Sequence, residues 1–378
     1  MTRRETPLRY DPVLLAAVLV LLMLGVVMVY SASAVYADVR LGDGLFFFKR
    51  QLVGAVLGVC ALLFALHLGH GRFGRLSALL LLFVVLLLVL LHVPGLGHAA
   101  GGARRWLKIG PLQFQPSELA KIVFVLWLSR SLARRQDRLA TFSEGILPHL
   151  AVLGVFAVLL LAEPDFGTTA VLFCVAFALL FVAGAGLRHL AICAAVAAPV
   201  GVFLVWHSRY RLDRMLAFLD PWADPRGRGY QAVESLLAFG AGGGFGVGLG
   251  ASSQKLFFLP AAHNDFILSI IGEELGFAGV AAVLVLFAVL VWRGIRAAHA
   301  AADAEACFVA LGLTFLLAAQ VLVNAGMALS LLPTKGIALP FLSYGISSVV
   351  SSSLAAGILL SVSGGTGGFL RRPVGGRR

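Results

Sequence analysis

Long uninterrupted runs of apolar residues are the feature that most restricts the folds open to this chain. Two of the clearest runs are Val13–Tyr30 and Ala78–Leu91. A helix needs about 20 apolar residues to cross the hydrocarbon core of a bilayer, whereas the strands of an outer-membrane barrel are only about 10 residues long and alternate in polarity. The whole chain is 60% hydrophobic, above the roughly 45–50% of soluble domains. These patterns predict an all-α integral membrane protein.

The apolar segments predict about ten transmembrane helices in one polytopic membrane domain that covers residues 1–378. We recognise no strand pattern and no internal repeat. The first span is expected to be an ordinary helix, because no convincing cleavage site for a signal peptide follows it. One long extracytoplasmic loop, about residues 207–265, joins the seventh and eighth spans, and long structured loops are usually functional. The predicted spans are 12–31, 49–68, 76–94, 116–132, 146–163, 167–184, 188–206, 266–292, 305–330 and 340–363.

The distribution of basic residues predicts the orientation of the chain. With an even number of spans, the tails of residues 1–11 and 364–378 lie on the same side of the membrane. That side receives 16 of the 30 Lys and Arg residues, nearly all in short loops and tails. Because short basic loops face the cytoplasm, we expect both termini to be cytoplasmic. These residues are Arg3, Arg4, Arg9, Arg72, Arg75, Arg130, Arg134, Arg135, Arg138, Arg188, Arg293, Arg296, Arg371, Arg372, Arg377 and Arg378.

The other 14 basic residues fall on the outer side, where the same rule predicts few. Long loops can cross regardless of charge, but this explanation fits poorly the compact segment 101–110, GGARRWLKIG. Basic residues outside and beside the membrane suggest an anionic ligand such as a lipid phosphate or pyrophosphate. Nucleic acid is not an expected partner of an integral membrane protein facing outward. The outer basic residues are Arg40, Lys49, Arg50, Arg104, Arg105, Lys108, Lys121, Arg209, Arg211, Arg214, Arg226, Arg228, Lys255 and Lys335.

Several classes of cofactor are not expected from the sequence. The four cysteines lack CxxC spacing and the nine histidines form no HExxH pattern, so no zinc site is predicted. The glycine-rich segment 239–250 lacks the Gly-Lys-Ser/Thr ending of a phosphate-binding loop and follows no strand. Its glycines are instead predicted to allow tight turns and close backbone approach. Neither a nucleotide nor haem is therefore expected.

A single carboxylate, Asp265, stands at the predicted start of the eighth span. Because a carboxylate at membrane depth costs roughly 2.5–3.5 kcal/mol, its presence needs an explanation. One explanation is a helix N-cap, which the residue type alone favours. The other is a base that takes a proton from an attacking hydroxyl while outer arginines hold an acidic leaving group. Glu273 and Glu274, about two turns further on, are predicted to bind polar groups of neighbouring helices.

Five longer motifs occur in the order GARRWLKIGPLQFQPSELAK, EPDFGTT, PWADPRGRGYQ, LPAAHNDFILSIIGEELG and LLPTKGIALPFLSYG. They resemble the SEDS family (shape, elongation, division and sporulation proteins) over about residues 45–350. The resemblance implies a peptidoglycan glycosyltransferase in the bacterial cytoplasmic membrane that polymerises lipid II into β-1,4 glycan strands at the outer face. It also implies, as partners, the growing lipid-linked glycan, a monofunctional class B penicillin-binding protein and other membrane proteins of the division or elongation complex.

The resemblance further implies roles for seven residues. Asp265 is the implied catalytic residue, as a general base or as the ligand of a divalent cation, Mg²⁺ or Mn²⁺. Simpler structural roles are open for Trp106 as an interfacial anchor, for Glu118 in the first turn of a helix and for Asp165 as an N-cap. The residues implied to bind substrate are Arg50, Arg105, Trp106, Glu118, Lys121 and Asp165.

The sequence departs from the family pattern at three positions. Ala261, Asn264 and Ile346 stand where the family commonly has Glu, Thr and Gly. Because the first two flank the proposed base, the binding of the acceptor or of a metal is expected to differ in detail. Ser343 and Tyr344, in the last motif, are predicted to pack between helices.

Within the family, two branches compete. The QKL before FFLP and the PTKG of Pro333–Gly336 indicate an FtsW-like division protein more than a RodA-like elongation protein. Two other functions stay open: a lipid II flippase, because ionisable residues in spans and broken helices are typical of transporters, and a silent scaffold that recruits the transpeptidase. The absence of a clear inverted repeat and the position of most charge at the outer rim favour the enzyme over the transporter.

Overall fold

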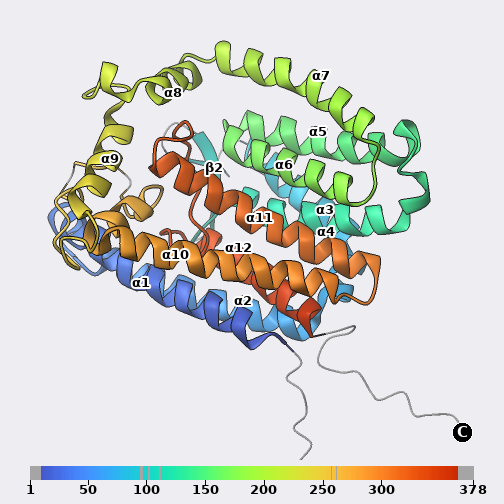
Figure 1. Cartoon of the computed structure of the whole chain (residues 1–378), viewed down its shortest axis with the longest axis horizontal. Helices are drawn as coiled ribbons and strands as arrows, with labels where there is room; N and C mark the ends of the chain where they lie inside the picture. The colour runs from blue at the N-terminus through green and yellow to red at the C-terminus, as the bar shows by residue number, and fades with distance from the viewer. Residues whose placement is uncertain are drawn as a thin grey trace, which may run out of the picture.

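The computed structural model is a bundle of long helices and describes residues 10–93, 97–100, 103–109, 112–256, 258–260 and 262–364 (Figure 1). Residues 1–9 and 365–378 of the predicted tails, and Ala261, lie outside the described residues. The helices are α1 (Pro12–Leu41), α2 (Phe46–Leu68), α3 (His70–Leu90), α4 (Pro116–Arg134), α5 (Leu147–Ala162), α6 (Phe166–Val182), α7 (Leu187–Trp206), α8 (Arg209–Leu219), α9 (Tyr230–Gly242), α10 (Ile267–His299), α11 (Ala304–Ala328) and α12 (Ile346–Ser363), with short helical turns at Gln136–Arg138, Phe142–Ile146 and Pro221–Ala223.

Each of the ten predicted spans contains a helix, although the last, predicted over 340–363, is helical only from Ile346. Within the described ranges, eight helical segments are long and apolar enough to cross a membrane: α1, α2, α3, α5 with its preceding turn, α7, α10, α11 and α12. The other two predicted spans correspond to α4, which carries buried charged residues, and to the apolar α6 of 17 residues. The prediction of a helical, multi-pass membrane protein is confirmed.

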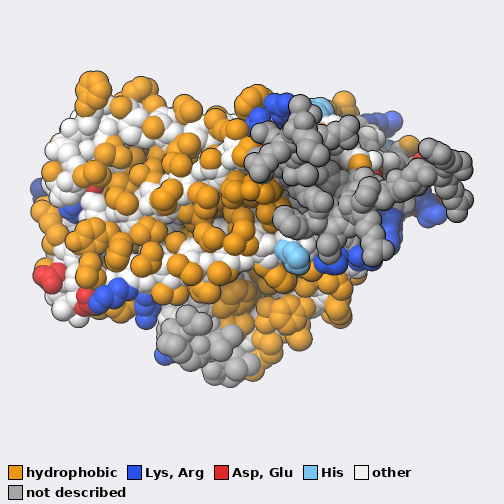
Figure 2. Space-filling model, turned by 90° about the horizontal axis from the view of Figure 1, so that it is seen from below, with side chains coloured by type: hydrophobic (Ala, Val, Ile, Leu, Met, Phe, Trp, Pro, Cys, Tyr) orange, Lys and Arg blue, Asp and Glu red, His pale blue; other side chains and the backbone are white. Residues whose placement is uncertain are grey.

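The surface and the chain ends agree with this arrangement. Figure 2 shows hydrophobic side chains over the middle of one face of the molecule, with Lys and Arg side chains gathered toward its two ends. The beginning of the first helix and the end of the last lie side by side, because the backbone N–H of Asp11 donates to Ser363 Oγ at 3.0 Å. Arg293 of α10 also pairs with Asp11. An even number of crossings would bring the two ends together in this way.

Small residues let α2 and α12 pack closely. A Cβ added to Gly58 of α2 would lie 2.8 Å from the hydroxyl of Ser353, which is fully buried in α12. A Cβ on Gly54 would lie 3.4 Å from Ile346, one of the positions that departs from the family pattern. Small residues at the interface of two membrane helices allow this close approach. The contact holds α2 against α12.

One small antiparallel sheet contradicts the prediction that the chain has no strands. Its order is β1-β2-β3, with β1 (Gly97–Ala100), β2 (Ala103–Ile109) and β3 (Leu112–Phe114). The strands are too short for a periodicity to stand out. A pair of glycines separates β1 from β2 in the sequence, and this common hairpin signal could have indicated the antiparallel pairing of the two strands. The sheet connects α3 to α4 and carries Arg105 on β2.

The predicted long loop contains α8, α9 and the glycine-rich segment, which packs back onto a kink in α10. At Gly276 the backbone has φ +66° and ψ −166°, outside the helical range. The N–H of Val247 donates to the carbonyl oxygen of Glu273 at 3.0 Å, just before this kink. A Cβ on Gly246 would lie only 2.2 Å from the carbonyl oxygen of Glu274. The prediction that these glycines allow close backbone approach is confirmed.

Candidate active site

Asp265 lies at the end of the long loop, just before α10. The helix begins at Ile267, with Phe266 at the N-cap position and no capping by a side chain. The N-cap explanation for Asp265 is therefore wrong. Its half-buried carboxylate faces a glycine of the loop between α11 and α12, because a Cβ added to Gly336 would lie 3.3 Å from Asp265 Oδ2. The side-chain amide of Asn324 on α11 donates to the carbonyl oxygen of Asp265 at 2.9 Å and fixes its backbone.

The two residues before Asp265 are held by the loop that precedes α12. The hydroxyl of Ser343 donates to the carbonyl oxygen of Asn264 at 2.7 Å, and the N–H of Tyr344 donates to the carbonyl oxygen of His263 at 3.0 Å. The amide of Gln51 on α2 donates to the carbonyl oxygen of Ser343 at 3.3 Å. Ser343 and Tyr344 thus lie in a loop and support the Asp265 segment. They also pack against a helix as predicted, since Ser343 is buried and the Tyr344 ring lies 5.0 Å from that of Phe47 on α2, although both residues precede α12.

Basic side chains from distant parts of the chain converge near this carboxylate. Arg214 of α8 donates to the carbonyl oxygen of Thr334 at 2.6 Å, which brings α8 to the same loop as Gly336. The ammonium of the next residue, Lys335, lies 3.7 Å from the centre of the Phe166 ring at the start of α6. The long loop, the α11–α12 loop and α6 therefore meet at one cationic site.

The charges at this site change the ionisation of its members. Burial raises the pKa of Asp265, and the positive charges of Arg214 and Arg105 oppose this rise, which leaves the pKa at about 6. Burial also lowers the pKa of Lys335, with contributions from Arg211 and Arg214, to about 8. At neutral pH the site therefore holds an ionised carboxylate that retains substantial proton affinity, beside several positive charges.

Arg105 joins the sheet to the turn between α5 and α6. Its Nε donates to the carbonyl oxygen of Glu163 at 2.9 Å and its Nη2 donates to that of Pro164 at 2.6 Å. In the same turn, the carboxylate of Asp165 caps α6 by accepting from the N–H of Thr168 at 3.1 Å. The structural role proposed for Asp165 is confirmed, and its negative charge also acts on nearby Lys335.

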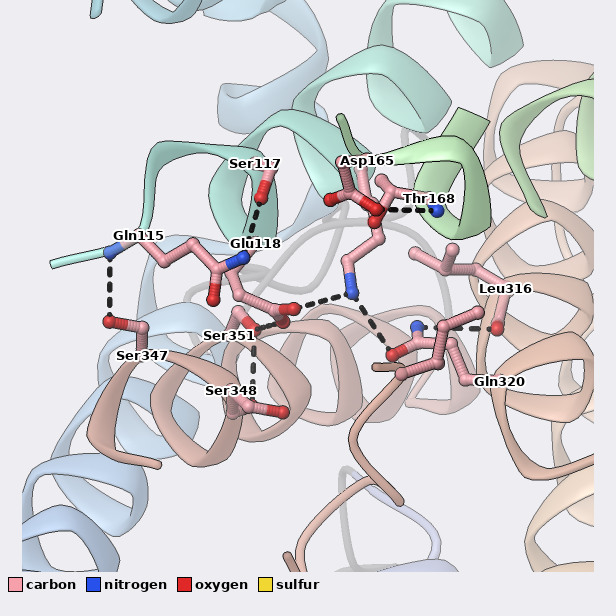
Figure 3. Close-up of polar contacts among 12 residues, drawn as sticks. Gln115, Ser117, Glu118, Asp165, Thr168, Leu316, Gln320, Ser347, Ser348 and Ser351 are labelled. Atoms are coloured by element: carbon pink, nitrogen blue, oxygen red, sulfur yellow. Dashed lines mark hydrogen bonds and ion pairs between the residues drawn. The ribbon is translucent and has the colours of Figure 1, made fainter. Parts of the chain in front are cut away.

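Glu118 and Lys121 form a buried ion pair at the start of α4. Lys121 Nζ donates to Glu118 Oε1 at 2.8 Å and to Gln320 Oε1 of α11 at 3.1 Å. The second carboxylate oxygen of Glu118 accepts from Ser351 of α12 at 3.0 Å. Figure 3 shows this network crossing from α4 to the two other helices, with Asp165 and Thr168 beside it. The pair joins three helices, and Glu118 lies in the first turn of α4, the structural role left open for it.

Arg50 and Trp106 lie more peripherally. The exposed Arg50 extends from α2, with its guanidinium carbon 4.5 Å from the centre of the Phe46 ring. The half-buried Trp106 lies on β2 next to Arg105. Arg50 directly precedes Gln51 on α2, and Gln51 bonds to the loop that holds the Asp265 segment, so Arg50 borders the site.

The glutamates of α10 have structural partners. Glu273 accepts from the N–H and the hydroxyl of Ser253, both at 2.9 Å. Glu274 accepts from the hydroxyl of Ser31 on α1 and pairs with the buried ammonium of Lys255 at 2.9 Å. The prediction that Glu274 binds a polar group of a neighbouring helix is confirmed, while Glu273 binds the long loop instead.

Three residues of the site, Arg214, Lys335 and Asn324, were not predicted from the sequence to belong to it. Arg211 and Arg214 stand three residues apart on α8, a spacing that places both on one helix face. That spacing and the PTKG motif were usable signals. Their meeting with Asp265 depends on contacts between residues about 50 to 120 positions apart, which spacing does not reveal.

A metal ion held by protein ligands alone does not fit the described part of the chain. No group of three or more His, Cys, Asp or Glu side chains is arranged there to hold one. Mg²⁺ is, however, often bound through one or two carboxylates together with substrate phosphates. Asp265 fits that second pattern.

Known proteins similar to this chain share its length and its fold. The family model of FtsW, RodA and SpoVE, described as cell cycle protein, matches residues 12–366. The chain is 46% identical over 354 residues to the probable peptidoglycan glycosyltransferase FtsW of Geobacter sp. strain M18, covering 94% of this chain and 96% of that protein. It is 41% identical over 362 residues to stage V sporulation protein E of Bacillus subtilis strain 168, covering 96% and 98%. A solved chain from work on the structural coordination of polymerization and crosslinking by a peptidoglycan synthase complex has a TM-score of 0.77 and 32% identity, covering 94% of this chain and 98% of that chain.

Proposed function

This chain belongs to the cell cycle protein family of FtsW, RodA and SpoVE, and we propose that it is a peptidoglycan glycosyltransferase that polymerises lipid II. The match over residues 12–366 confirms the SEDS resemblance predicted from five motifs. The observation that carries the proposal is the half-buried carboxylate of Asp265, influenced by the charges of Arg105 and Arg214. Transfer of a glycosyl group from a lipid pyrophosphate needs one base to accept the proton of the attacking hydroxyl. It also needs positive charges to stabilise the pyrophosphate, which leaves without a proton.

The reaction joins two lipid-linked saccharides. The 4-hydroxyl oxygen of the GlcNAc in the incoming lipid II attacks the anomeric carbon at the reducing end of the growing strand. The bond from that carbon to the pyrophosphate oxygen breaks, its electron pair stays on the pyrophosphate, and the hydroxyl proton passes to Asp265. Attack from the opposite face converts an α-linked pyrophosphate into a β-1,4 glycosidic bond. A positioned base of this kind contributes about 10²–10⁴-fold to the rate.

The basic residues hold the leaving pyrophosphate in this proposal. Arg105 and Arg214 can each present a planar guanidinium to phosphate oxygens, and Lys335 adds a compact charge. These groups stabilise the charge that develops as the bond breaks. Glu118 and Lys121 support this site through their helices, while Arg50 and Trp106 border it.

A divalent cation, Mg²⁺ or Mn²⁺, is part of the proposal as an ion shared between Asp265 and substrate phosphates. It would supply additional positive charge to the pyrophosphate when bound. Arg105, Arg214 and Lys335 contribute charge of the same sign, so the ion supplements the protein groups.

We place the reaction at the outer face of the cytoplasmic membrane, with both termini in the cytoplasm. The support is the asymmetric distribution of basic residues in short loops. The contact between Asp11 and Ser363 is consistent with it, since it places the beginning of the first helix beside the end of the last.

The proposed partner is a class B penicillin-binding protein that crosslinks the strands. The support is structural similarity, with a TM-score of 0.77, to a solved chain from work on a peptidoglycan synthase complex. That work concerns the structural coordination of polymerization and crosslinking. Other membrane proteins of the division complex belong to the same proposal.

We assign the chain to septal wall synthesis, with wall elongation as the alternative. The support is the identity of 46% to a protein named FtsW, over nearly the full length of both chains. Depletion of the protein in its own host separates the two: filaments with few septa support division, and rounded cells support elongation.

The first test is polymerisation of labelled lipid II by the purified protein with its cognate transpeptidase, with and without a chelator. The wild type should make long strands, and Asp265→Asn should lower the rate by roughly 10²–10⁴-fold without loss of folding. Asp43→Asn is the matched control, because this exposed carboxylate pairs with Lys49 at 3.0 Å outside the site. Normal turnover by Asp265→Asn would remove the aspartate from the mechanism. No strands from the wild type, with partner and metal present, would favour lipid transport or scaffolding.

A further inference from the structure

Five aromatic side chains from four parts of the chain form a cluster beside the proposed catalytic segment. We call it the aromatic platform: Tyr36 of α1, Phe46 and Phe47 of α2, His263 of the long loop and Tyr344 of the loop before α12. Phe47 lies at its centre, with ring centroids 4.5 Å from His263, 5.0 Å from Tyr344 and 6.1 Å from Tyr36. The Phe46 ring lies 5.2 Å from that of Phe47.

The platform is close to the reactive carboxylate. His263 precedes Asp265 by two residues, so their Cα atoms are at most about 7.6 Å apart. The two side chains have different surroundings: the carboxylate faces Gly336 and the arginine charges, whereas the imidazole contacts rings on α1 and α2. The short segment 263–265 therefore has a cationic site at one end and an aromatic surface at the other.

The chemistry of the platform suits a sugar. Tyr36 is 37% exposed and the other four rings are half-buried, so the cluster is not closed off as an ordinary core would be. A pyranose has a C–H face that leaves water favourably against aromatic rings, and a polar rim that hydroxyls or a guanidinium can bind. Arg50, stacked on Phe46, supplies such a group at the border.

The placement distinguishes this cluster from an interfacial aromatic belt. Aromatic residues of a belt anchor separate helices at the membrane surface. Here the rings contact one another, and His263 belongs to the backbone segment that carries the base. The cationic site already accounts for the pyrophosphate, and the remaining part of the substrate that must reach Asp265 is the acceptor saccharide.

On the basis of the proposed function, we propose that the aromatic platform is the subsite for the acceptor saccharide of lipid II. The C–H face of the sugar packs on Tyr36 and Phe47, and the 4-hydroxyl points toward Asp265. Binding there places the attacking oxygen before reaction, so the platform contributes to acceptor affinity and leaves the transfer of the proton to the carboxylate.

The test measures KM for lipid II and kcat during strand elongation, when lipid II is the acceptor. Tyr36→Leu and Phe47→Leu should each raise KM by about 2- to 12-fold, the range for loss of one aromatic contact, with kcat changed less than about twofold. Tyr36→Trp and Phe47→Tyr keep an aromatic ring, so their KM should stay near the wild-type value. Tyr30→Leu is the matched control, since this tyrosine is 44% exposed on the same helix but contacts Phe48 outside the platform.

A lipid II analogue with a short prenyl chain separates a sugar site from a lipid site. We expect the same fold-change in KM with both substrates. A change that disappears with the short chain would assign the rings to the lipid, and a fall in kcat at constant KM would assign them only to the support of the Asp265 segment. Either result overturns the proposal, as does an unchanged KM in both Leu variants of a protein whose wild type makes strands. Failure of the wild type to make strands would instead contradict the proposed function, and this inference with it.

Discussion

The ionisation of Asp265 sets the pH dependence expected of the reaction. Burial raises its pKa, and Arg214 and Arg105 oppose this, giving about 6. A base acts only when it is deprotonated, so activity should be present above pH 6 and fall as the pH decreases through that value. At pH 5 roughly a tenth of the carboxyl groups would be ionised. The measurement is kcat/KM for lipid II polymerisation between pH 5 and pH 8.

Arg214→Gln provides the matched comparison for this pH profile. Removing a positive charge that lowers the pKa of Asp265 should move the midpoint to higher pH, whatever happens to the maximal rate. A wild-type midpoint near 4, the ordinary value for an aspartate, or a flat profile over the whole range, would contradict the role of a desolvated base.

Single residues were predictable from the sequence to different degrees. A carboxylate beside a span is costly, and that cost alone drew attention to Asp265. The residue type alone favoured its use as an N-cap, and only the start of α10 at Ile267 excluded it. Arg214 and Lys335 could not be joined to it, because their proximity comes from the packing of α8 and the α11–α12 loop. Residue type predicts a chemical capability, and tertiary packing decides which capabilities meet.

Among the elements, the start of α4 depends on the buried pair of Glu118 and Lys121. Their side chains are 10% and 5% exposed, so loss of one partner leaves an uncompensated buried charge. Lys121→Met should lower the free energy of unfolding by about 3–5 kcal/mol. Glu118→Gln combined with Lys121→Met should recover part of this loss, because both charges are then removed. Thermal unfolding of the purified variants in one detergent measures both effects.

The comparison of these two variants also tests a substrate role for Lys121. If the lysine only stabilises helices, the double variant should regain activity together with stability. A double variant that is as stable as the wild type but inactive would show that Lys121 acts on the substrate. Arg130→Met is a suitable reference, because Arg130 on the same helix pairs with Glu305 of α11 at 3.0 Å, away from the site.

Helices and strands were predictable from the sequence where their apolar pattern extends over many residues. Runs of about 20 apolar residues specify helices with little ambiguity, and each of the ten predicted spans contains a helix. The sheet was missed because strands of three to seven residues give too few alternations to recognise. The kink of α10 was not predicted either: Gly276 alone does not imply a break, and the break needs the glycine-rich segment to replace helical hydrogen bonds.

At the scale of the whole molecule, the chain gathers residues from its full length into one end of the bundle. The site draws its residues from five separate segments, and the packing of helices α4 to α11 brings these segments together. The residues are Arg105, Asp165, Arg214, Asp265 and Lys335. Aromatic rings from α1 and α2 complete the same end. The opposite end holds the beginning of α1 and the end of α12. The site can reach extracytoplasmic sugars only if its end of the bundle faces outward.

Cysteine labelling tests this orientation in cells. In a background without the four native cysteines, we compare Lys108→Cys on β2 with Arg138→Cys in the turn after α4, both at exposed positions. Because basic residues in short loops remain in the cytoplasm, a membrane-impermeant maleimide should label position 108 in intact spheroplasts and position 138 only after lysis. The reverse pattern would place Asp265 on the cytoplasmic side, where no growing wall is available, and the polymerase assignment would fail with it.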